Sequence, residues 1–255
     1  MSKIVSIHSY RGGTGKSNST ANLAATIARH GYRVGVVDTD IQSPGIHVLF
    51  GFDEDQIDRS LNDYLWGRRA IQEVAYDVTS VLEGKGTERS KLFLVPSSAK
   101  AGEIARVLRE GYDVGLLNDG FQDLVKALKL DYLLIDTHPG LNEETLLSIT
   151  ISDVLVLILR PDQQDYQGTA VTVDVARKLE VPKLLMVVNK APTVFDAALL
   201  KQKVEEAYSA VVAGVLPHSN EMMVLASAGI FSVKYPHHPL TQIVEAIAHQ
   251  IMHKS

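Results

Sequence analysis

The sequence predicts an α/β fold in which a doubly wound, mostly parallel sheet is flanked by helices. First, six apolar runs of strand length are hydrophobic almost continuously, as strands covered on both faces should be. Second, amphipathic stretches of helix length separate these runs. Third, a glycine-rich loop directly follows the first run, at residues 9–15. In sheets of this kind, ligands bind at the carboxyl ends of the strands.

The predicted elements follow one another along the whole chain. The strands are Lys3–His8, Arg33–Val37, Lys91–Val95, Tyr132–Asp136, Val154–Leu159, Lys183–Val188 and a weaker Val211–Val215. The helices include Ser19–His30, Phe121–Leu128, Thr169–Leu179 and Ala197–Tyr208. The charged segment Asp53–Ser90 interrupts the alternation, and we expect short helices beside the sheet and a flexible loop at its end. We expect residues 1–255 to form a single domain.

Composition excludes several classes of protein. Hydrophobic residues make up 45% and charged residues 22%, which is typical of a soluble, well-cored chain. The net charge of −5 argues against a uniformly basic nucleic-acid binder, although a local basic patch stays open. The absence of cysteine excludes disulfides, iron–sulfur clusters and a thiol nucleophile. We see no signal peptide, and the longest apolar run is far short of the roughly 20 residues that span a bilayer, so we expect a cytoplasmic protein.

The stretch HSYRGGTGKSNST, residues 8–20, nearly fits a phosphate-binding loop. The common form G-x-x-x-x-G-K-S/T would place its first glycine at position 10, where Tyr10 stands. In a strand–loop–helix context, glycines aim backbone N–H groups at phosphates, Lys16 reaches the β- and γ-phosphates, and the Ser17 hydroxyl ligates Mg²⁺. The alternative is a glycine-rich turn that only joins a strand to a helix.

RGGTGKS, residues 11–17, resembles the deviant phosphate loop K-G-G-x-G-K-S/T of the ParA/MinD family of ATPases. That family does not require the first glycine, which accounts for Tyr10. The other family motifs follow in order over essentially the entire chain. The resemblance implies a P-loop NTPase fold with ATP and Mg²⁺ as cofactors. It implies phosphate contacts from Arg11, Gly12, Gly13, Thr14, Gly15, Lys16, Ser17 and Asn18.

Two acidic motifs match the family's catalytic centre. VVDTD, residues 36–40, matches D-x-D, and the resemblance implies that Asp38 helps to hold the Mg²⁺ water shell while Asp40 positions the attacking water. YLLIDTHPG, residues 132–140, ends a strand at Asp136, a Walker B pattern that implies a Mg²⁺ contact beside that of Ser17. Phosphoryl transfer needs mainly such positioning and charge neutralisation. A turn-capping role is the alternative for Asp40. His138 is a candidate base, although a histidine on a polar loop is more often hydrogen-bonded structure.

The adenine-binding part of the site is implied by two later segments. LLMVVNK, residues 184–190, ends a strand at the place where the family recognises adenine through an asparagine, and LPHS, residues 216–219, resembles its second adenine loop. The implied contacts are Asn189, Lys190, Leu216, Pro217 and His218. The alternative for each segment is common turn chemistry after a strand.

Arg11 stands where the family has a signature lysine that reaches the partner's ATP across a nucleotide-sandwich dimer. Arginine keeps the charge and adds a planar fork suited to phosphate. We hypothesise that Arg11 acts in trans like an arginine finger, which makes the implied catalytic set Lys16, Asp40 and Arg11. The alternative is an arginine on the outer face of the loop. Some carboxysome-positioning members of the family also lack the lysine.

Residues that this chain lacks argue against several branches of the family. Iron–sulfur carriers and related enzymes need cysteines, which this chain lacks. The C-terminal segment has an apolar face without aromatic residues, so we expect a packed terminal helix rather than a membrane anchor. Its apolar residues are Leu240, Ile243, Val244, Ile247 and Ile251.

The resemblance therefore implies a ParA-like switch that positions or partitions a plasmid, a chromosome or a large protein assembly. It implies an ATP-bound homodimer, an adaptor that stimulates hydrolysis, and non-specific binding of nucleoid DNA. The candidate DNA contacts are Arg160, Arg177, Lys178, Lys183, Lys201, Lys203 and Lys234, and the alternative is that these are scattered solvating charges. Two other functions stay open: a MinD-like regulator acting through proteins without DNA, and an ATP-dependent metabolic synthetase.

Overall fold

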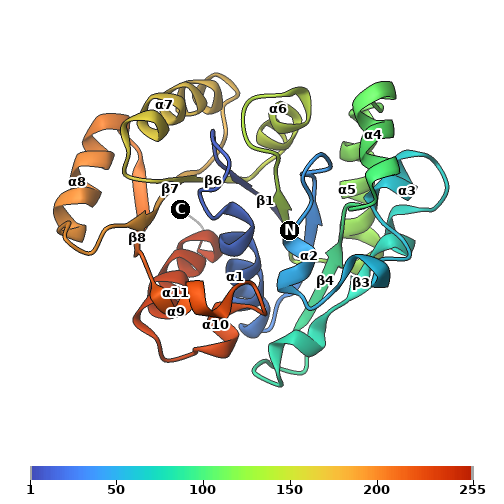
Figure 1. Cartoon of the computed structure of the whole chain (residues 1–255), viewed down its shortest axis with the longest axis horizontal. Helices are drawn as coiled ribbons and strands as arrows, with labels where there is room; N and C mark the ends of the chain where they lie inside the picture. The colour runs from blue at the N-terminus through green and yellow to red at the C-terminus, as the bar shows by residue number, and fades with distance from the viewer. Residues whose placement is uncertain (1, 254–255) are drawn as a thin grey trace.

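A computed structural model describes residues 2–253 and contains one eight-stranded sheet over that range (Figure 1). Its strands are β1 (Lys3–His8), β2 (Arg33–Asp38), β3 (Tyr76–Asp77), β4 (Lys91–Val95), β5 (Tyr132–Asp136), β6 (Val154–Leu159), β7 (Leu184–Ala191) and β8 (Val211–Pro217). The strand order is β3-β4-β2-β5-β1-β6-β7-β8, and every neighbouring pair is parallel except β3 and β4. The predicted doubly wound, mostly parallel sheet is confirmed.

Helices cover both faces of the sheet (Figure 1). They are α1 (Lys16–Arg29), α2 (Ile46–Leu49), α3 (Leu61–Leu65), α4 (Ala101–Glu110), α5 (Gly115–Leu128), α6 (Glu143–Thr150), α7 (Gln163–Lys178), α8 (Ala197–Tyr208), α9 (Asn220–Leu225), α10 (Phe231–Lys234) and α11 (Pro239–Met252). Short 3₁₀ helices lie at Glu54–Gln56, Ile71–Val74 and Thr79–Leu82. Helices α1 and α11 pack against one face, and α3, α5, α7 and α8 pack against the other.

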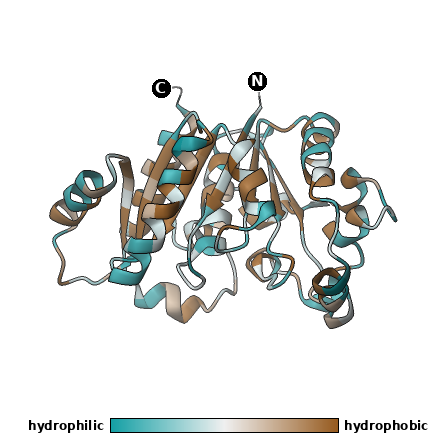
Figure 2. Cartoon of the chain, turned by 90° about the horizontal axis from the view of Figure 1, so that it is seen from above, coloured by the Kyte–Doolittle hydropathy of each residue, from teal (hydrophilic) through white to brown (hydrophobic). Residues whose placement is uncertain are grey.

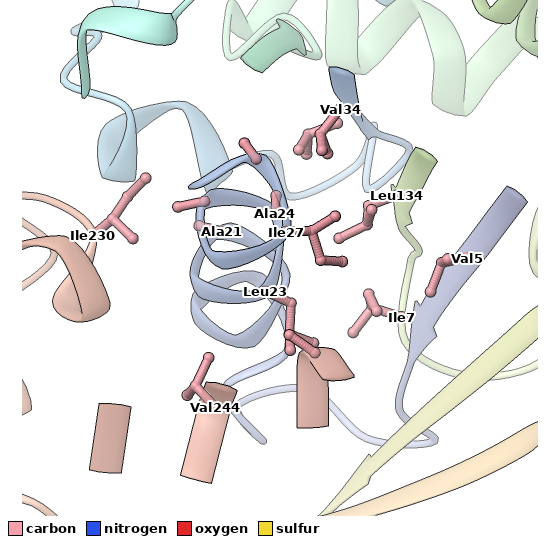
Figure 3. Close-up of a cluster of buried hydrophobic side chains, with 14 of the residues drawn as sticks. Val5, Ile7, Ala21, Leu23, Ala24, Ile27, Val34, Leu134, Ile230 and Val244 are labelled. Carbon is pink, nitrogen blue, oxygen red and sulfur yellow. The ribbon is translucent and has the colours of Figure 1, made fainter. Parts of the chain in front are cut away.

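The core follows from the period of two in the strands, because successive side chains point to opposite faces. Val5 and Ile7 of β1 belong to the cluster around α1, whereas Ile4 belongs to the cluster around α5. Figure 3 shows Val5 and Ile7 beside Ile27 of α1. Figure 2 shows hydrophobic strands enclosed between helices that carry both hydrophilic and hydrophobic residues. This two-sided burial explains why the strands read as continuous apolar runs.

The structure extends several predicted elements. Helix α1 begins at Lys16, as the strand–loop–helix context predicts, because Gly15 turns the chain in the left-handed region; the amphipathic stretch from Ser19 starts one turn later. Strand β2 reaches Asp38, and β7 continues to Ala191 through register shifts. The segment 53–90 contains α3 and the 3₁₀ helices as expected. It also adds β3, a two-residue antiparallel edge strand whose length is too short to be seen in the sequence pattern.

The predicted C-terminal helix is α11, and it packs into the core. Leu240, Val244, Ile247 and Ile251 are buried there against α1 and β8, and Ile243 lies partly buried beside them. Among residues 2–253, the longest and most apolar helices still fall short of what a membrane crossing requires.

Candidate functional site

The phosphate loop connects β1 to α1 and leaves the N-terminus of that helix open. Gly13 and Gly15 adopt φ values of 76° and 92°, which side chains with a Cβ disfavour. No side chain caps α1, and its first turn holds no acidic residue. The loop residues 12–18 line a cavity of about 290 Å³ together with Ser9, Asp40, Pro139 and Lys190. Free N–H groups and the helix dipole therefore face a cavity, which suits an anion such as a phosphate.

Lys16 forms a buried ion pair at the floor of this loop. Its Nζ lies 2.8 Å from Asp136 Oδ1, and the two side chains are only 7% and 1% exposed. Thr20 Oγ1 donates a second hydrogen bond to the same oxygen, over 3.0 Å. The other oxygen, Asp136 Oδ2, is buried without a hydrogen-bond partner in residues 2–253. Asp136 therefore retains an unused acceptor in the place where the sequence predicted a metal contact.

Asp38 lies directly opposite Asp136 in the β2–β5 ladder. Its two carboxylate oxygens accept hydrogen bonds from the backbone N–H groups of Asp40 and Gly45, at 3.0 and 3.3 Å. Burial, and next the charge of Asp136, raise the pKa of Asp38 well above its ordinary value. Two buried carboxylates thus share one lysine. A divalent cation would relieve their repulsion, so the pair fits Mg²⁺, which binds through carboxylates and water.

Asp40 lines the cavity and is held by His138. His138 Nδ1 donates a hydrogen bond of 2.7 Å to Asp40 Oδ1, and both side chains are mostly shielded from solvent. This bond raises the pKa of His138 above its ordinary value. Sequence reasoning gave His138 little weight. His138 follows Asp136 by two residues, as Asp40 follows Asp38, and Asp38 and Asp136 lie opposite each other on neighbouring strands. This matched spacing is the signal in the sequence that could have placed His138 beside Asp40.

The end of β7 contacts the phosphate loop directly. Asn189 Nδ2 donates to the carbonyl oxygen of Thr14 over 2.7 Å, and Lys190 Nζ donates to that of Gly13 over 2.8 Å. A Cβ on Gly15 would lie 2.4 Å from Asn189 Nδ2, so this glycine also permits the close approach of β7. The structure therefore joins the predicted adenine-binding asparagine to the predicted phosphate loop.

The second predicted adenine loop lies one strand further along the sheet. Pro217 pairs with Ala191, and the backbone N–H of His218 donates to the Ala191 carbonyl oxygen over 2.8 Å. The side chain of Leu216 is buried in the hydrophobic core. Only the backbone of Leu216 therefore remains available to a nucleotide, whereas His218 is exposed.

Tyr10 and Arg11 lie against α7, outside the phosphate cavity. The Arg11 guanidinium donates a hydrogen bond to the Gln164 side chain, and its Nε lies 3.8 Å from the Asp165 carboxylate. The Tyr10 ring covers Gly168, where a Cβ would come within 1.9 Å of Tyr10 Cδ1. We call residues 10–11 the docked lip of the loop. No pattern in the sequence indicates this contact.

Most of the basic residues predicted to bind DNA make contacts within the chain. Arg160 pairs with Asp162 and Asp165, Lys201 with Glu205, and Lys234 with Glu83, while Arg177 and Lys183 donate to backbone carbonyl oxygens. Lys178 and Lys203 complete the set, on α7 and α8. Arg160, Lys201 and Lys234 are therefore paired with carboxylates, whereas the hydrogen bonds of Arg177 and Lys183 to carbonyl groups leave their positive charge in place.

The chain is similar in sequence to known ATP-binding and iron–sulfur cluster carrier proteins. A family model described as an AAA domain matches residues 2–184. An uncharacterised ATP-binding protein of Methanocaldococcus jannaschii, MJ0547, is 25% identical over 255 residues, which cover 99% of this chain and 88% of that protein. An iron–sulfur cluster carrier protein of Methanococcus maripaludis is 32% identical over 195 residues, which cover 74% of this chain and 61% of the longer relative.

Solved structures share the fold over nearly the whole chain. The septum site-determining protein MinD of Pyrococcus horikoshii, in complex with Mg-ADP, aligns with a TM-score of 0.78 at 20% identity, covering 99% of this chain and 96% of that one. An ATP complex of McdA from Cyanothece aligns with a TM-score of 0.78 at 16% identity, covering 100% and 98%. At these identities the likeness establishes the fold.

Proposed function

The chain belongs to the AAA domain family, whose model covers residues 2–184, and on that premise we propose that it is an ATP-hydrolysing switch of the ParA/MinD type. The observation that carries the proposal is the cluster of Lys16, Asp38, Asp40 and Asp136 beside the open N-terminus of α1. ATP and Mg²⁺ are the cofactors, and the chain acts as a single ATPase domain. The fold is shared with a MinD that holds Mg-ADP and a McdA that holds ATP.

Each residue of the cluster has a separate role in the proposed phosphoryl transfer. Bound Mg²⁺ would supply positive charge against the phosphates, and Ser17, Asp38 and Asp136 would hold it, in part through water. The backbone of residues 12–18 cradles the phosphates. Lys16 is paired with Asp136 in this structure and exchanges that partner for phosphate oxygens when the nucleotide enters. Asp40, fixed by His138, orients the attacking water.

Adenine binding is assigned to the ends of β7 and β8. Asn189 and Lys190 already contact the phosphate loop, and Pro217 lies beside them through its pairing with Ala191. In this assignment the Asn189 side chain reads the base, while His218 and the backbone of Leu216 border it.

The switch itself is a homodimer that forms with ATP and dissociates after hydrolysis, with Arg11 reaching the partner's phosphates. Because Arg11 contacts Gln164 and Asp165 here, the trans contact requires the docked lip to leave α7. Size-exclusion chromatography with ADP or ATP tests this. The wild type should dimerise only with ATP, Asp40→Ala should be trapped as a dimer, and Arg11→Ala should bind ATP yet stay monomeric. An unchanged Arg11→Ala dimer would exclude the trans role.

The dimer is proposed to position cargo through an adaptor that stimulates hydrolysis and through ATP-dependent, non-specific DNA binding on the nucleoid. A DNA mobility shift titrated with salt tests the DNA contact, because neutralisation of phosphates makes affinity fall steeply as salt rises. A shift that requires ATP and is weakened in Lys178→Ala or Lys203→Ala supports it.

A second candidate is a regulator that acts through protein partners without DNA. The carboxylate partners of Arg160, Lys201 and Lys234 favour it, because these three cations are already paired within the chain. It predicts ATP-dependent dimers that leave DNA unshifted even at low salt. A metabolic synthetase would instead form a dimer that is independent of nucleotide. Iron–sulfur transfer is not proposed, because these 255 residues lack the cysteines that hold such clusters.

A further inference from the structure

We propose that His30, Glu245 and His249 form a binding site for a zinc-like divalent cation, far along α1 from the phosphate loop. His30 follows the last residue of α1, and the other two residues lie on α11. One ligand atom from each of the three side chains lies within 4.8 Å of the other two. The site is independent of the ATPase chemistry proposed above.

The spacing of the donor atoms is suited to a metal. Glu245 and His249 are four residues apart on a helix, so their side chains lie on the same face. His249 Nε2 is 3.6 Å from Glu245 Oε1, which is too long for a hydrogen bond but close to the ~3.3 Å between two ligands of a tetrahedral zinc. His30 Nε2 contacts the same oxygen from the other helix. Only small side-chain movements would bring the three donors around one ion.

His249 also has coordination capacity to spare. Neither of its ring nitrogens takes part in a hydrogen bond with another part of residues 2–253, and its ring lies 5.0 Å from that of His30, edge to face. The ring of His253 stacks on that of His249, with centroids 5.9 Å apart. Imidazole rings thus gather at one place on the surface, with a carboxylate between two of them.

The local electrostatics also suit a cation. Helix α1 ends beside His30, and the C-terminus of a helix carries partial negative charge, whereas the last carbonyl groups of α11 accept hydrogen bonds from Lys3 and Lys183. Two cations, Arg29 and Lys85, line the adjacent cavity. Arg29 donates to the Ser232 carbonyl oxygen and Lys85 to that of Val233, so both are directed toward other acceptors.

The donor set defines the ligand class. Two imidazoles and one carboxylate are the donors that zinc and similar transition metals accept, whereas Mg²⁺ prefers oxygen ligands. Three protein donors leave a fourth position for water, in keeping with side chains that are 33–47% exposed. A bound ion would join the end of the phosphate-loop helix to α11 and so tie the C-terminal helix to the body of the ATPase.

Calorimetric titration of the full chain with ZnCl₂, in excess Mg²⁺ and without nucleotide, tests the site. The wild type should bind one Zn²⁺ per chain. His249→Ala and Glu245→Gln should weaken binding at least about tenfold, since loss of even an outer partner of a metal site costs 10- to 100-fold. His237→Ala is the matched control, because His237 is an exposed histidine on the loop before α11 and is not one of the three donors. It should bind Zn²⁺ as the wild type does.

Thermal unfolding provides a second measurement on the same proteins. Zn²⁺ should raise the unfolding midpoint of the wild type and of His237→Ala, because a ligand that binds only the folded state stabilises it. The midpoint of His249→Ala should rise much less, while its basal ATP hydrolysis stays unchanged. The proposal is overturned if the wild type shows no saturable Zn²⁺ binding, or if His249→Ala and Glu245→Gln bind Zn²⁺ as tightly as the wild type.

Discussion

Helix α1 has charged residues at both ends, and the two ends differ in burial. At its N-terminus, Lys16 and Asp136 are almost fully buried and in direct contact. At its C-terminus, His30 and Glu245 make a similar contact with about a third of each side chain exposed. An ion pair removed from water is costly to break, whereas an exposed pair contributes little. Breaking the buried contact should therefore cost far more free energy of unfolding than breaking the exposed one.

The largest expected effect follows from breaking the buried pair. Lys16→Ala should lower the turnover number for ATP at least about 100-fold, because in the proposed function Lys16 stabilises the phosphate that is transferred. It should also lower the free energy of unfolding by about 3 kcal/mol, because Asp136 is left unpaired beside Asp38. Steady-state kinetics and urea unfolding measure the two effects.

Lys190→Ala is the matched control for Lys16→Ala. Lys190 lines the same cavity but is exposed, and its Nζ donates to the Gly13 carbonyl oxygen rather than to a carboxylate. Its removal should leave the unfolding midpoint nearly unchanged. Equal destabilisation by the two variants would show that burial does not set the difference.

The contact between His138 and Asp40 predicts a smaller effect on turnover. His138→Ala should lower the turnover number about tenfold or more with an unchanged KM for ATP, because Asp40 loses the donor that orients it. His138→Asn should restore part of the rate, since its amide can donate near the position of Nδ1. Asp40→Asn should cost roughly 100-fold. A His138→Ala enzyme with wild-type turnover would remove His138 from the mechanism.

The docked lip provides the third test, at the phosphate end of α1. Gly168→Ala should destabilise the protein by about 1 kcal/mol, because the new methyl group overlaps the Tyr10 ring. The double variant with Tyr10→Ala should recover that loss. Gly102→Ala is the control: this helical glycine has open space around it, so alanine should stabilise α4 by up to about 1 kcal/mol. Urea unfolding that gives the same sign for Gly168→Ala and Gly102→Ala would argue against the overlap.

The smallest expected effect is at the exposed end of α1. In buffer with a chelator, Glu245→Gln should change the free energy of unfolding by less than about 0.5 kcal/mol, because exposed pairs are weak. A loss as large as that of Lys16→Ala, measured by the same urea unfolding, would mean that the corner is a stabilising cluster in its own right.

Much of the fold could be predicted because its signals are local. Continuous apolar runs gave the strands other than β3, since strands buried on both faces must be apolar throughout. The phosphate loop, Asp38 and Asp136 could be predicted because each motif is contiguous and lies at the end of a strand. The antiparallel β3 was missed because two residues carry no period, and α6 was missed although Asn142 caps it by accepting from the Thr145 N–H.

The sequence by itself determined the sheet, the phosphate loop and the ends of the strands where the acidic residues lie, because hydrophobic period and glycine placement act over a few neighbouring residues. Only the tertiary structure decided which distant side chains meet. His138 and Asp40 are 98 positions apart, and His30 and Glu245 are 215 apart. No local pattern encodes such contacts, because they depend on the order of the strands in the sheet and on the packing of α11 against α1.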